Sequence, residues 1–155
     1  MWCWLLYIVE QTATITAMNT ELAIRVHTIA EGGGHWAEEL ARKRGHSEGF
    51  DLNGFCAIAS AELFKRLKKA EISAEIHLAT SWGGSHAYVI VEDYIVDVTA
   101  TQFSEMRNKT VVIQHEKELG HLWYYRSAHV FVEPRKLRKA QIEWEWPQDQ
   151  IAFAR

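Results

Sequence analysis

Cys56, His86 and Asp97 are the residues whose types and order in this sequence could support nucleophilic chemistry. A cysteine attacks as its thiolate, which is stabilised by a nearby base or by the positive end of a helix dipole. Cys56 falls in the first turn of a predicted helix, where unpaired N–H groups favour the thiolate. A small buried hydrophobic residue is the alternative for Cys56, because free cysteines are among the most buried residue types. Cys56 is therefore a candidate nucleophile whose case depends on its partners.

The helix expected to carry Cys56 has the clearest pattern in the sequence. Between residues 54 and 70, apolar residues recur every four positions, and basic residues gather near the C-terminal end, where cations suit the helix dipole. The residue just before this segment, Asn53, is the expected N-cap.

Two predicted strands place His86 and Asp97 on one face of a hairpin. Runs rich in Val, Ile and Tyr span residues 86–91 and 94–99. A two-residue turn at positions 92–93 makes His86 and Asp97 diagonal neighbours, about 7–8 Å apart between their backbones. A one-residue bulge would instead place the carboxylate on the opposite face.

Asp97 interrupts an apolar run, where an unpaired carboxylate is costly. Two interpretations account for it: the side chain either pairs with the His86 imidazole or caps the following turn, before Thr99 and Thr101. The order of a cysteine, a histidine and an aspartate favours the first interpretation.

That order resembles the papain-like and transglutaminase-like cysteine enzymes. The segment Asn53-Gly-Phe-Cys56, followed by His86-Ala-Tyr-Val-Ile-Val91 and Asp97-Val-Thr-Ala-Thr-Gln-Phe103, is similar to the transglutaminase-like superfamily in particular, over about residues 50–103. The resemblance implies a nucleophile-bearing helix packed on an antiparallel sheet. It also implies thiol-dependent acyl transfer or hydrolysis on peptide or protein amides, of the cysteine peptidase, deamidase or transglutaminase type. Cys56 would be the nucleophile, His86 the general base and acid, and Asp97 the residue that orients the imidazole.

An oxyanion hole needs two donors. The Cys56 N–H is the first candidate, and the side chain of Asn53, Trp82 or Gln102 is the second. No glutamine stands upstream of the cysteine where papain-like enzymes have one, so the second donor stays open. Trp82 and the glycines after it could wall a substrate groove or form an ordinary connection with a core tryptophan.

The remaining sequence predicts an α+β layout with the helices first. Asn19 is expected to cap one helix, residues 32–34 to form a glycine hinge or loop, and residues 35–44 to form a second helix that Gly45 ends. Pro134 is expected to open a basic helix to about Glu145. Strands are expected at residues 74–80, 86–91, 94–99, 110–114, 123–125 and 128–132.

Composition limits the classes of function. The 155 residues, 48% hydrophobic, suit one domain, with residues 1–17 a strand or an extension before a natural start at Met18. Lys and Arg total 17 against 20 Asp and Glu, which argues against nucleic acid and anionic membranes as partners. The longest apolar run, residues 2–9, is too short to cross a bilayer. Two cysteines predict a reducing, cytoplasmic setting rather than a disulfide framework.

Two alternatives to a thiol enzyme were weighed. The spacing of five histidines does not match that of metal ligands, which argues against a metal site; they are His35, His46, His115, His121 and His129. We expect no cofactor. The second alternative is a non-catalytic interaction module on the same fold, which binds a protein partner through a surface rich in Trp and Tyr. Its aromatic anchors would be Trp123, Tyr124, Tyr125, Trp144 and Trp146, which could equally be core residues. The basic run at 135–139 could meet an acidic partner, although such runs usually face water.

Overall fold

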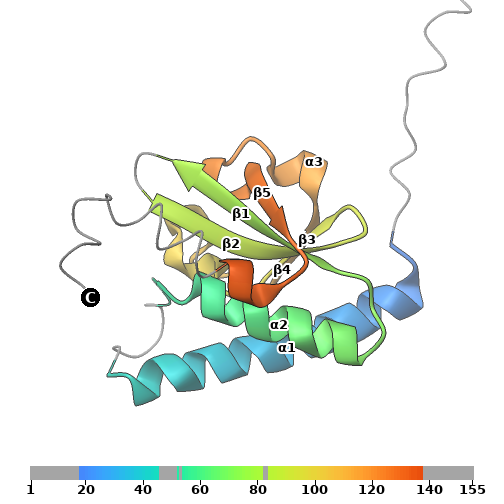
Figure 1. The fold of residues 1–155 in the computed structure, drawn as a ribbon, viewed down its shortest axis with the longest axis horizontal. Helices are drawn as coiled ribbons and strands as arrows, with labels where there is room; N and C mark the ends of the chain where they lie inside the picture. Colours follow the sequence, from blue (N-terminus) through green and yellow to red (C-terminus); the bar gives the residue numbers. More distant parts are fainter. Residues whose placement is uncertain (1–17, 46–51, 53, 82–83, 138–155) are drawn as a thin grey trace, which may run out of the picture.

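The computed structural model describes residues 18–45, 52, 54–81 and 84–137. Two long helices, α1 (Thr20–Lys43) and α2 (Cys56–Lys69), lie along one face of an antiparallel sheet (Figure 1). The predicted α+β class with helices on an antiparallel sheet is therefore confirmed. Among the described helices, none is both long and apolar enough to span a membrane.

Helix α1 is continuous, and the predicted glycine hinge at residues 32–34 is wrong. Asn19 caps the helix as expected, accepting from the N–H groups of Glu21 and Leu22, and the helix gives way to Gly45 at φ +81°. The glycines stay helical because α1 buries one face along its whole length, which outweighs the low helix propensity of glycine. Helices predicted separately before and after the glycines are one element.

A substitution at Gly33 tests whether the glycines serve only as residues of a continuous helix. A methyl group at Gly33 would meet Leu63 and Val98 at 3.7–4.0 Å, which is ordinary van der Waals contact. We expect Gly33→Ala to raise the free energy of unfolding by about 1 kcal/mol, because alanine has the higher helix propensity. Urea denaturation followed by tryptophan fluorescence measures the change. A destabilised variant would show that the glycine serves a bend or a closer approach.

Helix α2 begins at Cys56, so the predicted first-turn position of this residue is confirmed. The predicted N-cap is wrong: Phe55 occupies that position and makes no side-chain cap hydrogen bond, and Asn53 lies outside the described residues. A backbone hydrogen bond instead stabilises the segment before α2: the Phe55 N–H donates to the Leu52 carbonyl at 2.9 Å. Further along, the Ser60 hydroxyl donates to the Ala87 carbonyl of β2 at 2.9 Å, which ties α2 to the sheet.

The described strands form one antiparallel sheet in the order β4-β3-β2-β1-β5. Their bounds are β1 Glu75–Ser81, β2 Gly84–Val91, β3 Tyr94–Asp97, β4 Val112–His115 and β5 Ser127–Phe131. Val91 pairs with Tyr94 and Val89 with Val96, which is the register of the predicted two-residue turn. Glu92 adopts φ +53°, the left-handed conformation that such a turn requires. No bulge interrupts this pairing, so His86 and Asp97 keep their predicted common face.

Short helices follow β3 and β4. Two 3₁₀ turns (Ala100–Gln102 and Ser104–Met106) follow β3, and α3 (Glu116–Leu119) follows β4. The predicted strand at 123–125 is wrong, because Trp123–Tyr125 form a 3₁₀ turn that buries Tyr124 and Tyr125. Aromatic residues favour strands when neighbouring strands and side chains are available to pack against them. Here the burial of Tyr124 and Tyr125 favours the 3₁₀ turn instead. The helix predicted from Pro134 is helical through residue 137, and its remainder lies outside the described residues.

The sheet separates two hydrophobic cores. Alternate β2 residues such as Val89 face α1 and α2, whereas Tyr88 and Ile90 face the core formed by the short helices. His86 shares the alternation of Tyr88, so its ring enters the second core. Cys56 belongs to the first core. The two residues therefore approach each other at the boundary between the cores, where β3 has already ended.

Candidate active site

Three elements bring Cys56, His86 and Asp97 together. The cysteine opens α2, the histidine lies in β2, and the aspartate is the last residue of β3. All three are buried, with 2%, 0% and 1% of their surfaces exposed. Their proximity depends on the β2–β3 register and on the packing of the α2 N-terminal half against β2.

A short hydrogen bond joins the histidine to the aspartate. His86 Nε2 lies 2.8 Å from Asp97 Oδ2, which also accepts from the Tyr125 hydroxyl at 2.8 Å. The other carboxylate oxygen accepts from the Thr99 N–H at 2.7 Å and from the Thr99 hydroxyl at 3.0 Å. Four donors thus surround the carboxylate, an arrangement that satisfies an ionised, buried aspartate. Asp97 makes both of the interactions that the sequence offered, with the imidazole and with the following turn.

The pair stabilises its own charges. Burial alone would lower the pKa of His86, but the Asp97 charge and hydrogen bond, together with the Cys56 side chain, raise it to about 9. Burial alone would raise the pKa of Asp97, yet His86, with the Thr99 N–H and the Tyr125 hydroxyl, holds it below its ordinary value. At neutral pH the site therefore contains an imidazolium beside a carboxylate.

Cys56 completes a chain of hydrogen bonds, because its side chain bonds to His86. Asp97 already occupies Nε2, so the sulfur faces the Nδ1 side of the ring. Gln102 reaches the same side: its amide nitrogen lies 3.3 Å from Nδ1 and donates to the Thr99 carbonyl at 2.9 Å. The sulfur and an amide donor therefore share the Nδ1 side of the ring.

Aromatic rings enclose the imidazole. The edge of Phe103 meets it at 4.7 Å between centroids, and Tyr125 at 5.9 Å. Burial and the Asp97 charge raise the pKa of Tyr125, so its hydroxyl stays a neutral donor to the carboxylate. The Tyr88 hydroxyl donates to the Tyr125 carbonyl at 3.0 Å and thereby fixes this turn. The enclosure keeps water away from the charged pair and strengthens its attraction.

Tyr125, Thr99 and Phe103 are site residues that sequence reasoning did not assign to this role. Thr99 was detectable, because a hydroxyl two residues after an aspartate commonly bonds to that aspartate. No sequence pattern indicated that Tyr125 contacts Asp97, because the two residues lie 28 positions apart and on different elements. Among the predicted oxyanion donors, Gln102 joins the site, whereas Asn53 and Trp82 lie outside the described residues.

The structure also bears on the two alternatives. Within the described residues, no three His, Cys, Asp or Glu side chains gather as a metal-ligand set. Of the aromatic residues considered as anchors, Tyr124 and Tyr125 are core residues rather than surface residues, and Trp123 is 37% exposed. Trp144 and Trp146 lie outside the described residues.

Comparison with known proteins finds no matching protein-family model, curated protein or solved structure. What the site can do therefore follows from its own geometry. A sulfur at a helix N-terminus, an imidazole with a raised pKa and a carboxylate bonded to the far side of that ring form the arrangement of a thiol nucleophile with its base and orienting group.

Proposed function

We propose that this protein is a thiol-dependent acyltransferase or hydrolase that acts on peptide or protein amides, with a papain-like or transglutaminase-like architecture. The observation that carries the proposal is the continuous chain of hydrogen bonds from Cys56 through His86 to Asp97. Cysteine peptidase, deamidase and transglutaminase chemistry share this machinery and differ in which acceptor, water or an amine, resolves the acyl-enzyme.

In this mechanism Nδ1 of His86 holds the thiol proton before substrate binds, and the Cys56 thiolate attacks the amide carbonyl. The carbon–sulfur bond forms as the carbonyl π electrons move to oxygen. When the tetrahedral intermediate collapses, His86 gives the proton to the leaving amine, and a thioester remains on Cys56. Water or a second amine then attacks the thioester carbonyl as the same imidazole takes its proton. Collapse of the second tetrahedral intermediate breaks the carbon–sulfur bond and returns the Cys56 thiolate beside the His86 imidazolium. Asp97 holds the ring so that Nδ1 faces the sulfur, and it stabilises the imidazolium.

Gln102 is our choice for the second oxyanion donor, beside the Cys56 N–H. Its amide nitrogen lies 3.3 Å from His86 Nδ1 and donates to the Thr99 carbonyl. The protonated Nδ1 of the imidazolium cannot accept from this amide, so the amide is free to turn toward the developing oxyanion.

Substrate entry is assigned to the side of the site where Gln102 and Phe103 lie. Cys56 is 2% exposed, so a bulky amide reaches the sulfur only after covering side chains move. Gln102 and Phe103 contact the imidazole and are themselves partly exposed, unlike Tyr88, Tyr124 and Tyr125. Their displacement opens the Nδ1 side of the ring while the Asp97 side stays buried.

A covalent trap tests the proposal. A peptide library carrying a carbonyl-directed electrophile, such as a nitrile or an aldehyde, is incubated with the full chain, and adducts are mapped by mass spectrometry. We expect an adduct on Cys56, with Cys3 as the internal control, and no adduct in Cys56→Ala. Labelling of both cysteines alike, or of neither, would contradict the proposal and favour the non-catalytic interaction module.

A further inference from the structure

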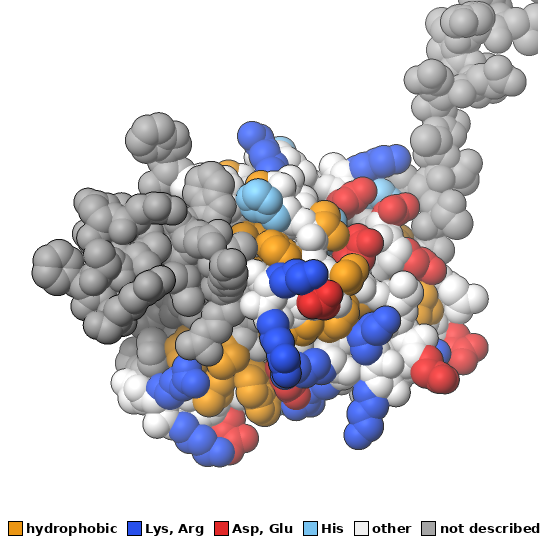
Figure 2. Space-filling view, in the orientation of Figure 1, with side chains coloured by type: hydrophobic (Ala, Val, Ile, Leu, Met, Phe, Trp, Pro, Cys, Tyr) orange, Lys and Arg blue, Asp and Glu red, His pale blue; other side chains and the backbone are white. Residues whose placement is uncertain are grey.

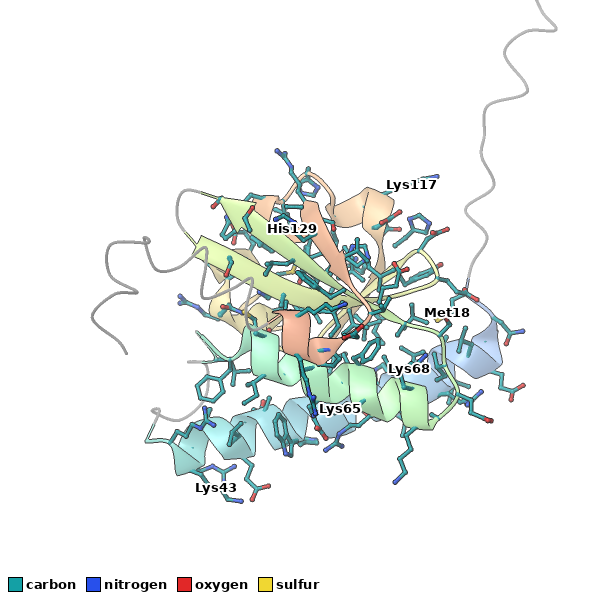
Figure 3. The ribbon with its side chains drawn as sticks, viewed as in Figure 1. Met18, Lys43, Lys65, Lys68, Lys117 and His129 are labelled. Carbon is teal, nitrogen blue, oxygen red and sulfur yellow. The ribbon has the colours of Figure 1, made fainter. Side chains whose placement is uncertain are left out.

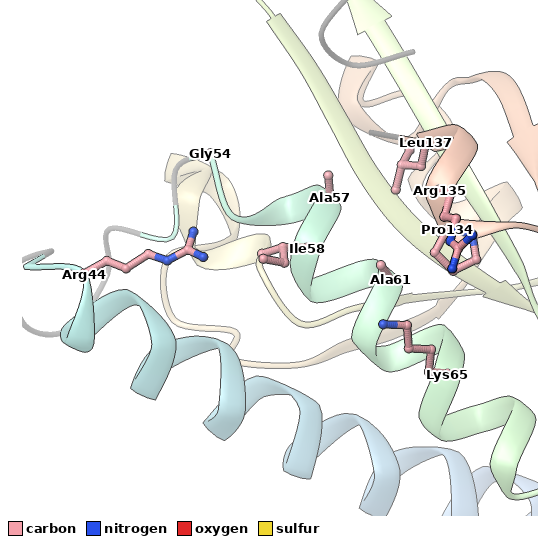
Figure 4. A pocket seen from close by; sticks show the side chains of 9 residues that line it. All are labelled: Arg44, Gly54, Ala57, Ile58, Ala61, Lys65, Pro134, Arg135 and Leu137. Carbon is pink, nitrogen blue, oxygen red and sulfur yellow. The ribbon is translucent and has the colours of Figure 1, made fainter. Parts of the chain in front are cut away.

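A second feature of the fold is a pocket of about 650 Å³ beside the start of α2 (Figure 4). The end of α1, the outer side of α2 and the helical residues 134–137 form it. Its lining residues are Arg44, Gly54, Ala57, Ile58, Ala61, Lys65, Pro134, Arg135 and Leu137. Gly54 and Ala57 bracket Phe55 and Cys56 in the chain, so the pocket adjoins the backbone that carries the candidate nucleophile.

The charged side chains among the described lining residues of the pocket all have one sign. Arg44, Lys65 and Arg135 line it from three separate elements, and no carboxylate is among its described lining residues. The chain as a whole carries a formal charge of −3, so this cationic lining runs against the overall balance. Figure 2 shows several Lys and Arg side chains on this face, with acidic side chains among them, beside hydrophobic surface. A ligand with negative charge is the complement of such a site.

The local backbone reinforces this preference. Ala57 and Ile58 precede the first hydrogen bond within α2, from the Ala59 N–H to the Phe55 carbonyl, so their N–H groups have no helical acceptor. The first turn of α2 contains no acidic residue, and its N-cap supplies no side-chain acceptor. The Arg44 guanidinium lies 5.7 Å above the Phe55 ring, which anchors this cation at the helix start.

The other pocket residues are apolar. Ala57, Ile58 and Ala61 form one wall, and Pro134 and Leu137 form the facing wall (Figure 4). A small inorganic anion would leave these walls empty, whereas a peptide with acidic side chains around an apolar residue satisfies both the walls and the cations.

We propose that this pocket is a subsite for an acidic peptide segment, whose anionic side chains pair with Arg44, Lys65 and Arg135 and whose apolar side chain packs on α2. The inference rests on the proposed function, because the pocket adjoins the start of α2, where Cys56 lies, and would select the substrate class of that site: peptides or proteins with acidic residues near the reacting amide. Specificity then comes from the charge of the substrate, while the chemistry comes from the thiol.

Binding is tested apart from catalysis. A labelled peptide with glutamates on both sides of a leucine, and its glutamine counterpart, are titrated by fluorescence polarisation against the full chain carrying Cys56→Ser. We expect the glutamate peptide to bind at least about tenfold more tightly, with the difference shrinking as salt increases. A phosphoserine version shows whether carboxylate or phosphate is the preferred anion, and either preference over glutamine supports the subsite.

Lys65→Glu and Lys68→Glu form a matched pair on the same helix, and Figure 3 shows both side chains on α2. Lys65 lines the pocket and Lys68 does not. We expect Lys65→Glu to weaken binding of the glutamate peptide about tenfold and Lys68→Glu to leave it within about twofold. Equal binding of the glutamate and glutamine peptides, or equal effects of the two substitutions, would overturn the subsite. Failure to trap an adduct on Cys56 would overturn the proposed function and leave this binding result unaffected.

Discussion

Replacing His86 by alanine is expected to slow the alkylation of Cys56 by iodoacetamide at least about 100-fold at pH 6. In the wild type, burial opposes the charge on His86, but Asp97 and Cys56 raise its pKa to about 9, so the ring is an imidazolium at pH 6. That cation stabilises the thiolate at a pH where an ordinary thiol is almost entirely protonated. Without it, the thiolate loses its only described cationic partner at this site.

The measurement is the rate of alkylation across pH, followed by mass spectrometry of the Cys56 peptide with Cys3 as the internal reference. At pH 6 the wild-type Cys56 should react faster than Cys3, and His86→Ala should abolish this difference. His121→Ala removes an exposed histidine away from the site and should match the wild type. A wild-type Cys56 that reacts no faster than Cys3 at pH 6 would contradict the ion pair, and the interaction module would then be the better interpretation.

Replacing Asp97 by alanine is expected to cost about 3–5 kcal/mol of unfolding free energy, because it leaves a buried partner charge uncompensated. The substitution also strands three other donors: the Tyr125 hydroxyl, the Thr99 N–H and the Thr99 hydroxyl. Asp97→Asn keeps the shape of the side chain and one acceptor oxygen, so its loss of unfolding free energy should be smaller than that of Asp97→Ala. Asp93→Ala removes an exposed aspartate from the neighbouring turn and is expected to stay within about 0.5 kcal/mol of the wild type.

The effect of pH gives this prediction a second readout. The folded-state pKa of His86, about 9, lies above its unfolded value near 6.5, so the stability from this proton is complete below pH 6.5 and is lost as pH rises through 9. The loss in the wild type amounts to about 3 kcal/mol. The pKa of Asp97 is lowered, so the stability that its charge contributes is lost only in acid, as pH falls through the folded-state value.

Urea denaturation from pH 5 to 10 measures both effects. The wild type should lose stability between about pH 6.5 and 9, and both Asp97 variants should show a flatter profile there, because the charge that raises the imidazole pKa is gone. If Asp97→Ala does not fold, Asp97→Asn carries the comparison. A wild-type profile that is flat over this range, or an Asp97→Asn profile parallel to it, would contradict the charged pair.

Local sequence determined the elements that carry the candidate site. The four-residue apolar repeat predicted α2 and placed Cys56 in its first turn, as the structure shows. The turn at 92–93 joins two buried strands, and this short connection determined the register that puts His86 and Asp97 on one face. Both features arise from contacts between residues close in the chain, so periodicity and turn length are sufficient to predict them.

Tertiary packing decided the rest. Glycines at 32–34 favour a break, yet α1 runs through them because its buried face packs against α2. Tyr125 reaches Asp97 from another element, and the aromatic turn that carries it formed a 3₁₀ helix where its composition favoured a strand. The cationic pocket joins the end of α1, α2 and the helical residues 134–137. Each of these features depends on contacts between distant segments, whose free energy outweighs local preference and leaves no period in the sequence.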